Sequence, residues 1–123
     1  MTTLNEQIID AAAWGQLQHL FADAEPGALE EILGAYLEES RGRLKDLRCS
    51  LEVRDTEKVR KTAHSLRGAC NSIGACMLGR LSERIELEAR AGRMDGLAPL
   101  VRLAENEFGR VHAQLQPLAQ AVA

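Results

Sequence analysis

The segment from Glu57 to Ile73, EKVRKTAHSLRGACNSI, has the apolar spacing of a single amphipathic helix. At about 100° per residue, its apolar side chains fall within one narrow stripe. The stripe consists of Val59, Ala63, Leu66, Cys70 and Ile73. His64 lies about 140° from the centre of this stripe, so we expect the stripe to enter a core and the imidazole to face solvent.

Helical patterns continue on both sides of this segment. We expect helices over about residues 10–21, 28–53, 57–73 and 77–91, and a last helix that begins near residue 95. Asp10 is the expected N-cap of the first helix, and Gly74 should end or bend the third. Apolar residues recur at three- and four-residue steps in the long second helix, where Ile32, Leu33 and Leu37 belong to the expected core stripe.

Four amphipathic helices with short connections pack most simply as an antiparallel up-down-up-down bundle. The predicted fold is therefore an all-α four-helix bundle, with the short N-terminal helix capping or flanking it. The chain has 123 residues and contains no low-complexity linker. We therefore expect one domain over residues 1–123, with a bundle core at about residues 27–119.

Composition and charge restrict the function classes. Hydrophobic residues make up 46% of the chain and aromatic residues only 3%, so aliphatic side chains must fill the core. The net charge of −3 disfavours a nucleic-acid partner. No apolar run approaches the roughly 20 residues of a membrane span, and the first ten residues lack the features of a signal peptide. We expect no membrane insertion and a cytoplasmic setting.

The chain has three cysteines, at positions 49, 70 and 76, and no CxxC pair. This pattern indicates neither a disulfide framework nor a zinc site. We expect three reduced, largely buried thiols.

The face around His64 is basic and contains a glycine inside the helix. Neutral imidazole is a good nucleophile near pH 7. Arg60, Lys61 and Arg67 lie about one turn from His64 on this face, where they would attract and stabilise a phosphoryl group. Gly68 costs roughly 1 kcal/mol relative to alanine, and its bare backbone would let a partner approach closely. From the residues alone, an ordinary solvated histidine remains an alternative.

The run Ala63-His64-Ser65-Leu66-Arg67-Gly68, followed five residues later by Gly74-Ala75, resembles the signature of histidine-containing phosphotransfer (HPt) domains. The family pattern is Ala-His-x-Leu-Lys/Arg-Gly, then five residues and a second glycine. The similarity covers about residues 29–118 and is weakest before Gly27.

The resemblance implies a role for each matching residue. His64 would be the phosphoryl acceptor, Arg67 would balance phosphate charge, and Gly68 would leave room for the partner. Gly74 would mark a helix junction. The family more often has lysine at the position of Arg67; arginine keeps the charge but changes its shape and reach.

The implied function is that of a phosphorelay intermediate. It would accept a phosphoryl group on His64 and exchange it reversibly with an aspartate in the receiver domain of a response regulator or hybrid sensor histidine kinase. We find no nucleotide-binding motif, so we expect no ATP site and no enzyme activity of the chain alone. The receiver would supply Mg²⁺ and most of the catalytic apparatus. We expect this chain to bind no cofactor or metal and to be a monomer.

Glu86 and Arg90 are spaced i,i+4 in the helix that follows. The simplest interpretation is a surface ion pair, worth a few tenths of a kcal/mol. The alternative is that both residues lie near His64 across two helices and help to orient it or meet the partner.

Three other classes of protein also combine a helical bundle with a histidine and are alternatives for this sequence. Dimerisation domains of sensor kinases usually have an acidic residue directly after the histidine, where this chain has Ser65. Ferritin-like metal bundles need Glu-x-x-His motifs, but Gln16, Lys61 and Gly109 precede the histidines at that spacing. A helical adaptor without chemistry remains as the third class, and it predicts normal partner binding after His64→Gln.

Overall fold

The computed structural model describes residues 4–119, and within that range it contains five helices and no strand. Their bounds are Ala11–Leu20 (α1), Ala28–Glu52 (α2), Thr56–Ile73 (α3), Cys76–Arg90 (α4) and Leu97–Ala119 (α5). Residues 1–3 and 120–123 of the expected 1–123 domain lie outside the described residues.

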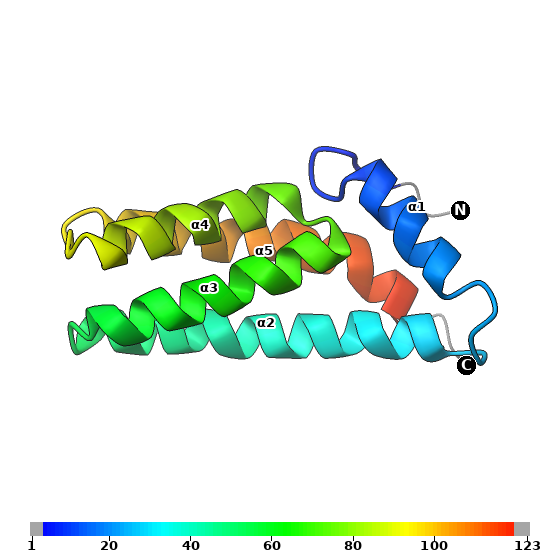
Figure 1. Ribbon diagram of the computed structural model, residues 1–123, viewed down its shortest axis with the longest axis horizontal. Helices are drawn as coiled ribbons and strands as arrows, with labels where there is room; N and C mark the ends of the chain where they lie inside the picture. The colour runs from blue at the N-terminus through cyan, green and yellow to red at the C-terminus, as the bar shows by residue number, and fades with distance from the viewer. Residues whose placement is uncertain (1–3, 120–123) are drawn as a thin grey trace.

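Helices α2 to α5 form an antiparallel bundle in which each helix packs against two neighbours (Figure 1). Helix α2 lies between α3 and α5, and α4 contacts the same two helices from the other side. The predicted all-α up-down-up-down architecture is confirmed. Helix α1 is inclined to the bundle at one end, beside the turn between α3 and α4.

The helix starts follow from local capping. The Asp10 side chain accepts a hydrogen bond from the Ala13 backbone N–H at 2.9 Å, and Asp55 caps α3 in the same way. The last helix begins at Leu97 rather than near Asp95 as predicted. Residues 94–97 form a turn before this helix, in which the Leu97 N–H donates to the Met94 carbonyl at 3.1 Å.

The core is aliphatic and includes the whole predicted stripe of α3. Ile32 was expected in the core, but it is 43% exposed. The adjacent Leu33 is buried at 1% exposure, and the roughly 100° between successive residues places Ile32 at the solvent-facing edge of the stripe.

Only one of the three cysteines is fully buried. Cys70 packs in the core with its Sγ 3.3 Å from the Tyr36 hydroxyl, and burial raises the pKa of its thiol to about 11. Cys76 is half-buried and Cys49 is exposed. The expectation of three largely buried thiols is wrong for Cys49, because the outer surface of α2 carries it.

Gly74 joins three helices at one point. Its φ of 89° lies in the left-handed region, and its carbonyl accepts the Asp10 N–H at 2.8 Å. A Cβ on Gly74 would lie 2.7 Å from the Ala13 Cβ. The glycine therefore permits the α3–α4 turn and the close approach of α1.

Gly74→Ala is expected to lower the free energy of unfolding by about 2–3 kcal/mol, from left-handed strain plus the clash with α1. Urea unfolding followed by circular dichroism measures this. Gly92→Ala is the matched control, since Gly92 also has positive φ (72°) but a Cβ there meets nothing within 4 Å. It should cost only about 1 kcal/mol. Equal losses in the two variants would contradict a stabilising contact between α1 and the turn.

Candidate functional site

His64 lies on the outer side of α3, where 58% of its side chain is exposed. The placement follows from the helix period, because the opposite side of α3 carries the buried stripe. An imidazole in this position is accessible to a partner molecule.

The partner of this imidazole comes from the next helix. Glu86 of α4 places its Oε2 2.9 Å from the His64 Nδ1, and its side chain is only 3% exposed. The surface-pair interpretation is therefore wrong for Glu86. About two turns away, toward the α3–α4 turn, the same helices pack closely: a Cβ on Gly79 of α4 would lie 3.1 Å from the Asn71 Oδ1 on α3.

Two guanidinium groups flank the Glu86 carboxylate. The Arg90 Nη2 donates to Oε2 at 2.9 Å, and the Arg67 Nε lies 3.5 Å from Oε1. Both arginines are partly exposed, so the buried negative charge is compensated from the solvent side. Within the part of the chain that the structure describes, Oε1 has no hydrogen bond other than this longer ion pair.

This arrangement specifies which ring nitrogen carries the proton. A carboxylate can only accept hydrogen bonds, so the His64 Nδ1 must donate to it. In the neutral ring the Nε2 then keeps a free lone pair. The Arg67 Nη2, 3.2 Å from Nδ1, cannot donate to a protonated nitrogen, so it supplies positive charge rather than a hydrogen bond.

In the described part of the chain, the other predicted site residues form no hydrogen bond or ion pair with His64 or Glu86, or lie beside open space. Arg60 is paired with Glu57 through an Nε–Oε2 hydrogen bond of 3.1 Å. Neither Arg60 nor Lys61 has a hydrogen bond or ion pair with His64 among residues 4–119. Gly68 is exposed, and a Cβ there would meet nothing within 4 Å. The structure thus brings Arg67, Glu86 and Arg90 together with His64 and leaves open space beside Gly68.

Over the described residues, no three His, Cys, Asp or Glu side chains are grouped as a metal site. Over the same range, no helix is long and apolar enough to cross a bilayer.

A family model for the Hpt domain matches residues 31–121. The chain belongs to the Hpt domain family. The relatives that it resembles include a phosphorelay regulator and a histidine-containing phosphotransfer protein.

One relative is multistep phosphorelay regulator 1 of Schizosaccharomyces pombe, 27% identical over 96 residues. The match covers 78% of this Hpt chain but only 32% of the relative, so the chain spans about a third of that protein. Among solved structures, the histidine-containing phosphotransfer protein B of Pseudomonas aeruginosa matches with a TM-score of 0.85 and 26% identity, covering 92% of this chain and 95% of that one. A histidine-containing phosphotransfer protein from maize has the same TM-score at 23% identity, over 94% and 85% of the two chains, and shows the shared fold.

The helix pattern predicted the exposed position of the Hpt histidine, but it did not predict the burial of Glu86. A signal was present: Glu86 directly follows Ile85 and lies three residues before Ala89, and both are buried in α4. Glu86 therefore lies at the edge of the apolar stripe. Its contact with His64 depends on how far apart α3 and α4 pack, which the spacing in α4 alone does not give.

Proposed function

We propose that this Hpt domain accepts a phosphoryl group on the Nε2 of His64 and passes it reversibly to an aspartate of a receiver domain. The observation that carries the proposal is the Nδ1–Glu86 hydrogen bond on an exposed imidazole, because it directs the free lone pair of Nε2 toward solvent. Nε2 attacks the phosphorus of an aspartyl phosphate. The N–P bond forms, the P–O bond breaks, and the aspartate leaves as a carboxylate.

The charged side chains around His64 can offset both the charge of the phosphorylated ring and that of the phosphoryl oxygens. The phosphorylated ring keeps its Nδ1 proton and becomes cationic, and the Glu86 carboxylate offsets that charge at 2.9 Å. Arg67 and Arg90 supply positive charge for the phosphoryl oxygens, while Arg60 and Lys61 contribute to the local field from further away. Phosphoryl transfer depends mainly on positioning and charge neutralisation, so a small set of side chains is sufficient here.

The proposed partner is the receiver domain of a response regulator or of a hybrid sensor histidine kinase. That partner would hold Mg²⁺ and supply most of the catalysis, and this chain would act as a carrier without an ATP site of its own. The name of the fission-yeast relative, a phosphorelay regulator, supports this assignment. The proposal includes a monomer in the cytoplasm, where the free thiols of this chain would stay reduced.

The test uses a small phosphoryl donor and the other two histidines as internal controls. After incubation with phosphoramidate, mass spectrometry should find one acid-labile adduct, on the tryptic peptide 62–67 that contains His64. His19 is exposed and should remain unmodified, as should His112. Addition of a Mg²⁺-loaded receiver domain should then remove the adduct and phosphorylate the receiver. Equal labelling of His19, or a His64 adduct that no receiver can remove, would overturn the proposal.

Gly68→Gln is expected to separate docking from chemistry. The added side chain enters the open space beside His64, so transfer from a phosphorylated receiver should slow by roughly tenfold, equivalent to about 1.4 kcal/mol of docking free energy. Labelling by phosphoramidate, which is too small to meet the new side chain, should be unchanged and serves as the control. A similar loss with both donors would mean that Gly68 affects the imidazole itself rather than the approach of the partner.

A further inference from the structure

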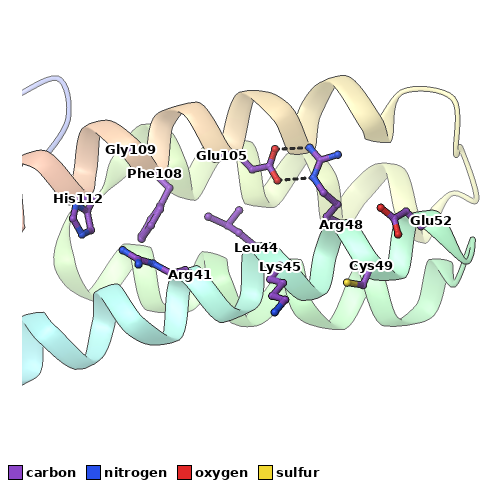
Figure 2. Close-up of a pocket in the computed structure, with 10 residues that line it drawn as sticks. All are labelled: Arg41, Leu44, Lys45, Arg48, Cys49, Glu52, Glu105, Phe108, Gly109 and His112. Carbon is purple, nitrogen blue, oxygen red and sulfur yellow. Dashed lines mark hydrogen bonds and ion pairs between the residues drawn. The ribbon is translucent and has the colours of Figure 1, made fainter.

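A groove of about 700 Å³ runs between α2 and α5 (Figure 2). These two helices form the side of the bundle opposite to α3 and α4, which carry His64 and Glu86. The groove is therefore separate from the proposed phosphotransfer site.

The open part of this groove is positively charged. Arg48 of α2 and Glu105 of α5 form a two-point ion pair across the groove, with an Nε–Oε2 distance of 2.8 Å, and neutralise each other (Figure 2). Arg41 and Lys45 are exposed on the same wall, and neither has an ion-pair partner in residues 4–119. Glu52 lies beyond the Arg48–Glu105 bridge. Two exposed cations one helical turn apart, Arg41 and Lys45, thus line this end of the groove on a chain whose net charge is −3.

The base of the groove is apolar, and one of its walls leaves room for the backbone of a bound partner. Leu44 and Phe108 line it from α2 and α5, and these core residues are 5% and 8% exposed there. Gly109 leaves one wall without a side chain, and a Cβ there would meet nothing within 4 Å. Residues 41 to 52 of α2 extend over roughly 16 Å at 1.5 Å per residue, which is about three helical turns. An amphipathic helix of one protein commonly binds in an apolar groove between two helices of another.

We propose that the α2/α5 groove is a docking site for an acidic amphipathic helix of a partner protein. The apolar stripe of that helix would lie over the exposed edges of Leu44 and Phe108, and its carboxylates would meet Arg41 and Lys45. Because the groove and His64 are on opposite sides of the bundle, this helix and a receiver domain can bind at the same time. The docking goes beyond phosphotransfer and does not depend on His64.

The probe is a fluorescein-labelled synthetic helix with leucines along one stripe and glutamates on the other side, measured by fluorescence anisotropy. It should bind the native chain and weaken as salt is raised, because part of the attraction is between exposed charges. Amide chemical-shift changes should map to α2 and α5. A version with lysine in place of glutamate should not bind, and His64→Gln should bind the probe as the native chain does.

Two pairs of variants locate the site. Gly109→Leu fills the groove and also favours the helix, so the fold should persist while binding weakens about tenfold. Gly15→Leu in α1, another exposed helical glycine with open space around it, is its control. The double change Arg41→Glu with Lys45→Glu should weaken binding at least as much, whereas Lys58→Glu with Arg80→Glu makes the same charge change elsewhere and should have little effect. No binding, full binding to Gly109→Leu, or shifts confined to α3 and α4 would each overturn the proposal.

Discussion

His64→Gln is expected to abolish phosphoryl acceptance, a loss of about 10⁴-fold or more, on the scale measured when an enzyme loses its nucleophile. Glutamine keeps much of the size and polarity of histidine but has no basic nitrogen to attack phosphorus. The exposed position means that the bundle should fold with unchanged stability. The rate of transfer from a radiolabelled phosphoreceiver, with urea unfolding as a check on the fold, measures both expectations.

His19→Gln provides the matched control for this result. His19 is also exposed and helical, but it lies on α1 and has no carboxylate partner among the described residues. Its replacement should leave the transfer rate unchanged. If His64→Gln still accepted phosphate, a different residue would carry the group and the proposed site would be wrong.

Glu86→Ala is expected to slow phosphoryl acceptance by about 100-fold, since loss of precise positioning commonly costs that much. Without the carboxylate, the ring can rotate and can adopt the Nε2–H tautomer that is preferred by a free histidine side chain. In that tautomer Nε2 has no free lone pair. Glu86→Gln should keep most of the activity, because its amide oxygen can still accept from Nδ1–H.

The tautomer itself can be measured apart from the rate. Imidazole ¹⁵N shifts distinguish a protonated ring nitrogen from a bare one, so the native chain should show Nδ1–H and the alanine variant a shift toward Nε2–H. Glu83→Ala, which removes an exposed carboxylate one turn earlier on α4, is the control and should change neither rate nor spectrum. A 100-fold slower Glu86→Ala with an unchanged tautomer would show that the carboxylate acts through charge alone.

The helix period predicted most of what lies within one helix. It identified the buried stripe of α3 and the exposure of His64, since both depend only on the angle between successive residues. Contacts between two helices could not be predicted in this way. The burial of Glu86 requires the spacing of α3 and α4, and the Arg48–Glu105 bridge joins residues 57 positions apart in the chain. Neither follows from the pattern of one segment.

The tight turn at Gly74 links the two helices that carry the proposed site. His64 and the residues that orient it all lie on α3 and α4, which are joined by a single tight turn at that glycine. The proposed chemistry would thus be carried by one continuous hairpin, with α2 and α5 as its scaffold. Surface substitutions on that scaffold can create or remove binding partners without disturbing the reactive pair, so one side of such a domain can diversify freely while the other keeps its chemistry.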